Sequence, residues 1–436
     1  MEEGAARCLV MRHLLVQLAL LGGLSAAVSP LPAQSWVATT APSTNWGSIA
    51  CSADGNNLVA GAGQNTAGLN VAGLIYVSHD SCATWAAADV PAGQWLSVAS
   101  SADGTTLLAA DYLNGLVYSS HDSGATWSSN NVPNEAWYSV ACSADGTISF
   151  AAALEGSQGF GSAADIYASM DSGATWAQTG APPGNWHSVA SSADGTKLAA
   201  LELGSDGLGN VWTSTNSGAA WHLAFSNPFA NWDVTCSADG TKMAAGSSGG
   251  TIFTSMDSGN TWTTNAGPNY SLYWMFLGCS ADGSTLVIDG IAAFPAGGYS
   301  AGVIFLSSDS GASWVQAPDQ GLVPADWSGI AISADGCKLV GAVTAFSSYS
   351  VSASPGGIFT LQFTPSPALS IVPSDGGLVL SWTVPSVNFG LQQNPDLAAT
   401  NWTDVPGTPA LDYSTLRSQV TLPAPPGPMF YRLISR

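Results

Sequence analysis

The sequence is poor in positive charge. Its 436 residues include 8 Lys and Arg against 29 Asp and Glu, which gives a formal net charge of −21. Nucleic-acid-binding proteins cluster Lys and Arg against the phosphates, so this composition excludes DNA or RNA as a partner. Charged residues of both signs make up only 8% of the chain, whereas helix-rich proteins are dominated by Ala, Glu, Lys and Leu. With 49 Gly, 24 Pro and 17 Trp, the composition instead favours an all-β protein with many turns.

Long hydrophobic runs are also scarce. The apolar run from Leu14 to Val28 follows Arg12 and His13 and is too short for a comfortable membrane span, but it suits an export signal. Small residues at 25–27 and 31–33 offer two alternative cleavage sites, and the acidic start of the chain leaves Met11 as an alternative first residue. We expect residues 1–33 to be a signal peptide and the mature chain to have no membrane span. The expected location is therefore secreted, periplasmic or on the cell surface.

One tetrapeptide, Ser-Ala-Asp-Gly, recurs seven times along the chain. Apolar runs lie on both sides of every copy, and two β-prone runs joined by Asp-Gly predict a hairpin, because Gly tolerates the positive φ of a tight turn. The Asp residues of the seven copies are Asp54, Asp103, Asp145, Asp194, Asp239, Asp282 and Asp335, at intervals of 42 to 53 residues.

A second motif, Ser-x-Asp-x-Gly-x-x-Trp, follows in six of the seven units. Its third position is occupied by Asp80, Asp122, Asp171, Asn216, Asp257 and Asp309. An apolar strand precedes each copy and the Trp opens another, so each unit contains four short strands. Four strands in a period of roughly 40–50 residues predict a β-propeller.

This second motif resembles the Asp-box, or BNR repeat, of the sialidase superfamily, sortilin-type receptors, xyloglucan-active hydrolases and photosystem II stability factors. The resemblance covers about residues 35–365 and implies that the motif is a structural turn between the third and fourth strands, away from the active face. The Ser and Asp oxygens would accept backbone N–H bonds in this turn, and the Trp would pack between sheets. Asn216 supplies the same bond in the fourth copy. Cys82 replaces Gly in the first copy and is expected to be strained.

The ends of the repeat array predict how the ring closes. The seventh unit has no Ser-x-Asp motif and no fourth strand after Phe363, whereas the segment Ser35 to Trp46 matches the fourth-strand pattern without three strands ahead of it. The N-terminal strand should therefore complete the last blade, which leaves no open sheet edge. The fold class is thus an all-β, seven-bladed β-propeller over residues 35–365, closed by the N-terminal strand.

The composition changes after Pro367. Alternating strands between Pro- and Gly-rich turns predict a small β-sandwich over residues 366–436. The tail resembles the short fibronectin-like module at the C-terminus of many secreted bacterial proteins, ending in an aromatic-Arg-Leu strand at Tyr431, Arg432 and Leu433. The resemblance allows two roles, attachment to a surface or a passive cap.

Arginine is absent from the predicted propeller. A sialidase holds the carboxylate of its substrate with three Arg side chains, and the Arg residues here are confined to Arg7, Arg12, Arg417, Arg432 and Arg436. Sialidase activity is therefore excluded. The three propeller lysines, Lys197, Lys242 and Lys338, share one position just after the hairpin Gly, where we expect solvated turn residues.

Acidic and aromatic residues interleave on the segments expected to form the face opposite the Asp-boxes. The acids are Asp111, Glu135, Glu155, Asp165, Glu202, Asp206, Asp289, Asp319 and Asp326, and the rings include Tyr112, Phe160, Phe229, Tyr270 and Tyr273. The longest loops between second and third strands belong to the sixth and seventh units. We therefore expect the best ligand-binding surface to be lined by Asp289, Phe294, Tyr299, Phe346 and Tyr349. The alternative is that these loops only pack on each other.

Cofactor and metal motifs are lacking. The five His show no paired metal spacing, and His79 and His121 occupy a variable turn position, so we expect no metal ligand and no cofactor. Four of the cysteines share one repeat position and are expected to be small buried core residues: Cys51, Cys142, Cys236 and Cys279. A disulfide between Cys82 and Cys337 is an alternative that ring closure would permit.

Two functional hypotheses follow. The first is a secreted, monomeric, non-catalytic binding or scaffold propeller whose ligand is a glycan or a peptide, recognised by flat rings and acids. The second is a glycoside hydrolase acting on a polysaccharide with a pair of carboxylates, for which no local motif selects the pair. A photosystem-type assembly factor is disfavoured because the chain lacks a basic contact face.

Overall fold

The computed structural model describes residues 35–435 apart from short gaps. The gaps are 64, 67–68, 71, 155–163, 205–206, 228–230, 248–249, 268–271, 294–298, 318–326, 345–355, 364–367, 375–376 and 386–388. The predicted signal peptide lies outside the described residues. Within them, no helix is long and apolar enough to cross a membrane.

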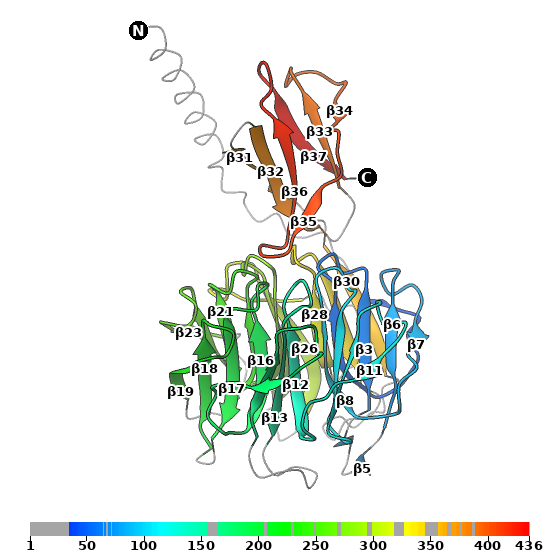
Figure 1. The fold of residues 1–436 in the computed structure, drawn as a ribbon, viewed down its shortest axis with the longest axis vertical. Helices are drawn as coiled ribbons and strands as arrows, with labels where there is room; N and C mark the ends of the chain where they lie inside the picture. Colours follow the sequence, from blue (N-terminus) through cyan, green and yellow to red (C-terminus); the bar gives the residue numbers. More distant parts are fainter. Residues whose placement is uncertain are drawn as a thin grey trace. The chain divides into compact units, whose positions relative to one another are not determined.

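Seven four-stranded antiparallel sheets form the predicted β-propeller (Figure 1). Blade 1 is β2 (Trp46–Cys51), β3 (Leu58–Ala62), β6 (Ile75–Ser78) and β7 (Ala86–Ala87); blade 2 is β8 (Trp95–Ser100), β9 (Leu107–Asp111), β10 (Leu116–Ser120) and β11 (Ser128–Ser129). Blade 3 is β12 (Ala136–Cys142), β13 (Ser149–Leu154), β14 (Ile166–Ser169) and β15 (Ala177–Gln178); blade 4 is β16 (Trp186–Ser191), β17 (Leu198–Leu203), β18 (Gly209–Ser214) and β19 (His222–Asn227).

Blade 5 is β20 (Asn231–Cys236), β21 (Met243–Ser247), β22 (Thr251–Ser255) and β23 (Thr263–Ala266); blade 6 is β24 (Leu272–Cys279), β25 (Leu286–Ala293), β26 (Tyr299–Ser307) and β27 (Val315–Gln316). Blade 7 is β28 (Trp327–Ile332), β29 (Lys338–Val343) and β30 (Gly357–Gln362), completed by β1 (Val37–Ala38). A two-stranded ribbon of β4 (Asn65–Thr66) and β5 (Leu69–Asn70) lies between β3 and β6.

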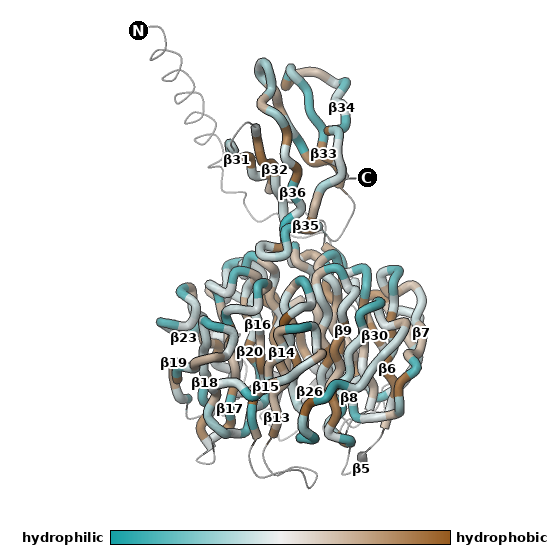
Figure 2. Tube along the Cα trace, in the orientation of Figure 1, coloured by the Kyte–Doolittle hydropathy of each residue, from teal (hydrophilic) through white to brown (hydrophobic). Residues whose placement is uncertain are grey.

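The order of the strands creates two distinct faces. The Ser-Ala-Asp-Gly hairpins join the first and second strands of each blade, and the Ser-x-Asp turns join the third and fourth, so both emerge on one face, here called the hairpin face. The loops between second and third strands and the connectors between blades emerge on the other, the loop face. Figure 2 shows hydrophobic residues concentrated along the strands and more hydrophilic residues at the turns.

The hairpins form a closed ring of backbone hydrogen bonds. The amide of each hairpin Ala donates to the carbonyl of the Ala in the next blade, from Ala53 N to Ala102 O at 2.8 Å through to Ala334 N to Ala53 O at 2.7 Å. The Gly of every hairpin has a positive φ between 61° and 75°, as the Asp-Gly pattern predicts. Because the ring closes after seven steps, the seven-bladed architecture follows from the hydrogen bonds as well as from the sheets.

The N-terminal strand closes the last blade, as predicted. Val37 pairs with Thr360 and Ala38 with Phe359, and Trp36 is buried against Trp327, with ring centroids 5.0 Å apart. Lys338 contributes to the same seam, because its Nζ donates to the carbonyl of Gly55 in blade 1 at 2.5 Å. The expectation of a solvated turn residue is wrong for Lys338, which is only 5% exposed.

Apolar side chains between adjacent blades form the core. The first strands carry Trp46, Trp95, Trp137 and Trp186, all without exposed surface. A Trp side chain buries about 150–250 Å², so each contributes about 4–6 kcal/mol of transfer free energy. Alternate positions of the second strands, such as Ala60, Ala109 and Ala152, are equally buried. The small Ala side chains leave room for the indoles of the neighbouring strands.

The Ser-x-Asp turns share one set of bonds. In blade 3, the Ser169 hydroxyl donates to Asp171 Oδ1 at 2.8 Å, and that oxygen also accepts the Thr175 amide at 2.8 Å. Ser169 Oγ accepts the Gly173 amide at 2.8 Å. These bonds hold the pKa of the Asp171 carboxyl below its usual range, with the Thr175 hydroxyl as the main donor. In blade 1, Cys82 has a φ of 73°, so the expected backbone strain is present.

The C-terminal residues form two small sheets that share a core. One sheet has the order β31 (Ser370–Ser374), β32 (Gly377–Thr383), β36 (Arg417–Pro423), β35 (Ala410–Asp412); the other has the order β34 (Thr403–Asp404), β33 (Phe389–Asn394), β37 (Phe430–Ser435). Leu380 and Trp382 of the first sheet pack with Leu391 of the second. Strands β31 and β35 were not predicted from the sequence.

All six described cysteines are free thiols, so Cys82 and Cys337 do not form a disulfide. The four cysteines at the shared repeat position are partly rather than fully buried. Desolvation by the surrounding blades raises the pKa of the Cys51, Cys142 and Cys236 thiols to about 12. These thiols are therefore protonated and unreactive at neutral pH.

Candidate functional site

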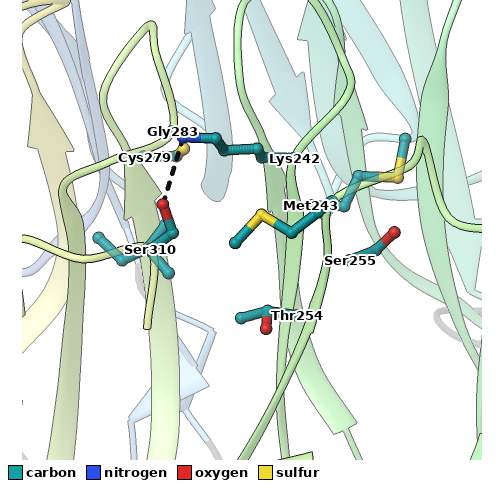
Figure 3. A pocket seen from close by; sticks show the side chains of 9 residues that line it. Lys242, Met243, Thr254, Ser255, Cys279, Gly283 and Ser310 are labelled. Carbon is teal, nitrogen blue, oxygen red and sulfur yellow. Dashed lines mark hydrogen bonds between the residues drawn. The ribbon is translucent and has the colours of Figure 1, made fainter. Parts of the chain in front are cut away.

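The hairpin face offers little space for a ligand. Figure 3 shows a hollow between blades 5 and 6, where Lys242 Nζ donates to Ser310 Oγ at 3.3 Å. Its volume of about 10 Å³ has room for about one water molecule, so the hollow is too small for a ligand. The turns around it repeat from blade to blade, and their polar groups bond within each turn.

The structure places Asp289 elsewhere than the sequence suggested. We expected Asp289 on a loop, but it lies inside β25, is 1% exposed and accepts the Phe276 amide on Oδ1 at 2.8 Å. The expected loop is shorter because β25 continues to Ala293 and β26 begins at Tyr299. Burial raises the pKa of the Asp289 carboxyl well above its usual range, and the nearby Asp233 adds to the effect.

The positions of the other predicted ligand-binding side chains are not described by the structure. Phe294, Phe346 and Tyr349 lie outside the described residues, and Tyr299 is described only as the first residue of β26. The same holds for five further acids and rings of the predicted loop face: Glu155, Phe160, Asp206, Phe229 and Tyr270. Asp319 and Asp326 also fall in a gap.

Two of the predicted surface acids support the local structure. Asp111 is 1% exposed, and its Oδ1 accepts the amides of Gln94 and Leu113, both at 3.1 Å. Glu202 Oε2 accepts the side-chain amide of Asn210 at 2.7 Å. These carboxylates stabilise loops and neighbouring strands, so their bonded oxygens are occupied within the fold.

A β-bulge interrupts every first strand at the same position of the repeat. The register shifts around one unpaired residue near the start of the strand, for example between Trp137 and Ser139 and between Trp186 and Ser188. The residue in the bulge differs from blade to blade, and so does the residue that follows it in blades 5 to 7. The bulge residue is Gly47, Leu96, Tyr138, His187, Trp232, Met275 and Ser328 in blades 1 to 7.

Three rings of successive blades meet at this level. Tyr112 at the end of β9 contacts Tyr138 with centroids 6.2 Å apart, and Tyr138 contacts His187 at 5.1 Å, both edge-on. Burial lowers the pKa of His187 to about 4, so its ring is neutral at pH 7. Burial also raises the pKa of the Tyr138 phenol, with smaller effects from Tyr112 and Asp233. We call Tyr112, Tyr138, His187 and Asp233 the axial cluster.

Asp233 links blades 4, 5 and 6. Its Oδ1 accepts the Ser188 hydroxyl at 2.5 Å, and its Oδ2 accepts the Leu277 amide at 2.8 Å. Ser occupies this position in the four preceding blades, so Asp introduces a negative charge where the repeat has a hydroxyl. Asp233 keeps part of its surface exposed, yet the surrounding chain desolvates its carboxyl and raises its pKa to about 6.

A second group of acids lies on the loop face of blade 3. Glu135 immediately precedes β12, and Asp165 immediately precedes β14. Glu135 Oε2 and Asp165 Oδ1 are both buried without a hydrogen-bond partner. Desolvation raises the pKa of the Glu135 carboxyl, and the charge of Asp165 raises it further. We call these two residues the blade 3 carboxylate pair.

The sequence reasoning missed Tyr138, His187 and Asp233. Tyr138 belongs to no sequence motif, and His187 directly follows Trp186 of a first strand. Variation within the repeat could have identified these residues. The two positions after the first-strand Trp change among blades, whereas the hairpin motif is constant. Within the described residues, no three His, Cys, Asp or Glu side chains are grouped so that they could hold a metal ion.

No protein-family model matches the chain, and no curated protein matches it in sequence. Among solved structures, the chain is similar to YCF48 bound to D1 peptide, with a TM-score of 0.52 and 16% identity over 77% of this chain and 98% of that one. YCF48 from Cyanidioschyzon merolae gives a TM-score of 0.51 at 14% identity, over 76% of this chain and 98% of that one.

A third similar structure is the GH74 xyloglucanase from Xanthomonas campestris. Its TM-score is 0.54 at 14% identity, over 80% of this chain and 59% of the xyloglucanase. The three structures include both a peptide-bound protein and a glycoside hydrolase, so the likeness alone does not separate binding from catalysis. At these identities it establishes one property of the chain: its fold is the β-propeller shared by the YCF48 and GH74 structures.

Proposed function

We propose that the chain is a non-catalytic binding propeller that takes an extended peptide on its loop face, at the axial cluster. The observation that carries the proposal is the contact of Tyr112, Tyr138 and His187 across three blades. Aromatic rings with polar tips give large contact area at low entropic cost, and they are enriched where proteins bind other chains. We further propose that the protein acts outside the cytoplasm.

The two faces differ in a way that favours this choice. Repeated turns with satisfied polar groups leave little for a ligand on the hairpin face. The loop face differs in every blade and can form an asymmetric surface, which specific recognition requires. A peptide is preferred to a glycan because one similar structure, YCF48, is bound to D1 peptide.

The test is a binding screen with a matched pair of variants. The purified chain is screened against an array of extended peptides and a glycan array, and affinities are measured by titration calorimetry. Tyr138→Ala should weaken the best peptide by about tenfold or more, as expected for a central aromatic anchor. Met170→Ala is the control, because Met170 is 53% exposed on a turn of the hairpin face. Equal affinity of Tyr138→Ala and the control would reject the axial cluster as the binding site.

A glycoside hydrolase is the second candidate, favoured by the blade 3 carboxylate pair. The raised pKa of Glu135 suits a general acid, and Asp165 is a neighbouring carboxyl for the role of base or nucleophile. Release of reducing sugar from xyloglucan and other polysaccharides, lost in Glu135→Gln, would establish this function. Absence of release across the polysaccharide panel would leave binding as the function.

The surface predicted from the sixth and seventh loops stays a prediction. Tyr299 and Tyr349 would be replaced together by Ala and the double variant titrated with the peptide selected above. A loss of affinity would extend the proposed surface to Phe294 and Phe346, whereas Asp289 stays excluded by its burial in β25. Unchanged binding by a folded double variant would restrict it to blades 2 to 5.

A further inference from the structure

We propose that the blade 3 carboxylate pair is a recognition subsite for an organic cation, the ammonium or guanidinium of a Lys or Arg side chain in the bound peptide. The inference rests on the proposed function and adds the chemical character of the ligand. Its basis is a pair of unpartnered, buried carboxylate oxygens, Glu135 Oε2 and Asp165 Oδ1.

The topology brings the two carboxylates to one edge. Strands β12 and β14 both pair with β13 and are therefore parallel to each other, so the residues that precede them emerge at the same end of the sheet. The Ala153 amide donates to the Asp165 carbonyl at 3.2 Å, which holds Asp165 in register with β13. The two residues thus lie at the same end of the sheet, on either side of the end of β13 and on the loop face, where burial and the charge of Asp165 raise the pKa of Glu135.

Burial shows that Asp165 is not a surface acid. Asp165 is 9% exposed, and one of its oxygens has no donor. Buried carboxylate oxygens in proteins are nearly always hydrogen-bonded, so an orphan oxygen calls for a partner. Glu135 Oε2, at the same end of the sheet, is a second buried oxygen without a hydrogen-bond donor.

No Lys or Arg of the propeller can pair with the two carboxylates. Its basic side chains are Lys197, Lys242 and Lys338, and all three follow hairpins on the opposite face. Lys197 and Lys338 donate to hairpin carbonyls, and Lys242 donates to a turn Ser. A cation at the pair must therefore come from outside the propeller.

The ring of Tyr167 lies close to the same two carboxylates. Tyr167 lies two residues after Asp165, and its phenol pKa is raised by burial and by the charges of Asp165 and Glu135. The Tyr167 ring packs edge-on against Trp137 with centroids 5.7 Å apart. Two carboxylates beside a ring favour an ammonium or guanidinium, which combines charge-assisted hydrogen bonds with cation–π attraction. A calcium ion would require six to eight oxygen ligands, more than two carboxylates supply.

The test uses charged peptides and their neutral isosteres. The probes are capped heptapeptides of Gly and Ser with one central residue: Arg or its neutral isostere citrulline, and Lys or norleucine. Affinities are measured by calorimetry at 0.3 M NaCl, so that the net charge of the chain is screened. We expect the Arg and Lys peptides to bind about tenfold more tightly than their neutral counterparts.

Variants of Glu135 and Asp165 test whether the preference for charged peptides depends on the blade 3 carboxylate pair. Glu135→Gln and Asp165→Asn, singly and together, should remove the preference while leaving the neutral peptides unaffected. Asp89→Asn is the control, because Asp89 is exposed on the connector between β7 and β8 of the same face and its replacement removes the same charge. Thermal melting checks that each variant is folded, and the single variants serve if the double variant is not.

The outcomes separate this inference from the proposed function. Equal binding of charged and neutral peptides, or a preference that survives in the double variant, overturns the cation subsite and leaves the peptide-binding propeller intact. Binding of none of the four peptides overturns the cation subsite, and the peptide array then decides the proposed function by itself. Displacement of the Arg peptide by micromolar Ca²⁺, lost in the double variant, assigns the pair to a metal ion and also overturns the subsite.

Discussion

The clasp that closes the propeller depends on one side chain, Trp36. Strand β1 is only two residues long and pairs with β30 through Val37 and Ala38. The Trp36 ring is 8% exposed and packs in a core with Leu339, Leu361 and Trp327. Trp36→Ala should therefore lower the free energy of unfolding by about 3–5 kcal/mol, the usual cost of truncating a buried Trp.

The effect of Trp36→Ala on stability should be large because β1 has few backbone hydrogen bonds to β30. Two paired residues cannot hold a strand against the conformational entropy of the free N-terminus, so the indole supplies most of the attachment. When β1 detaches, β30 becomes an open edge that can pair with another chain. Trp36→Ala should therefore also raise the tendency of the protein to aggregate on heating.

Urea denaturation followed by far-ultraviolet circular dichroism measures this effect. Val37→Ala is the matched control on the same strand, because Val37 is 59% exposed and its replacement should change the free energy by less than about 0.5 kcal/mol. An equal, small effect of both substitutions would refute the view that Trp36 holds the clasp. Size-exclusion chromatography of both variants tests whether loss of the clasp produces oligomers.

Three further predictions concern the repeats and the axis. Gly173 has a φ of 86°, and a Cβ there would lie 3.2 Å from Asn130 Oδ1, so Gly173→Ala should cost about 1–2 kcal/mol in urea denaturation; an unchanged midpoint would count against strain in the turn. Asp171→Ala should lower the melting temperature more than Asp171→Asn, because Asn216 accepts the equivalent Ser214 and Ala220 donors at 2.9 Å in blade 4; the reverse order would contradict this account. Burial raises the pKa of Asp233 from 3.8 to about 6, so the folded state binds more protons than the unfolded state in that interval and stability should fall as pH rises from about 4 to about 6. Asp233→Asn should flatten this slope in urea midpoints measured at pH 4, 5, 6 and 7, and an unaltered slope would assign it to other groups.

The amino-acid sequence determined the propeller because its evidence is local and repeated. The hairpins at Asp-Gly, the turns at Ser-x-Asp and the four strands of each unit depend on residues close together in the chain, and every copy confirms the others. Closure by residues 35–40 was also predictable, since one orphan fourth strand fits one incomplete blade. The strain at Cys82 followed from a single departure from the repeat.

The tertiary structure alone decided which side chains meet. The contacts of Tyr138 with Tyr112 and His187 cross blades about 26 to 49 residues apart in sequence, and no local pattern encodes them. Sequence could not separate a loop acid from a strand acid at Asp289, because strand length depends on pairing with neighbouring strands. It could not show that Lys338 is buried where blades 7 and 1 meet, since the partner of its ammonium is the carbonyl of Gly55, 283 residues earlier in the chain. Repetition thus determined the scaffold, and the differences between blades acquire chemical meaning only when closure brings them together around the axis.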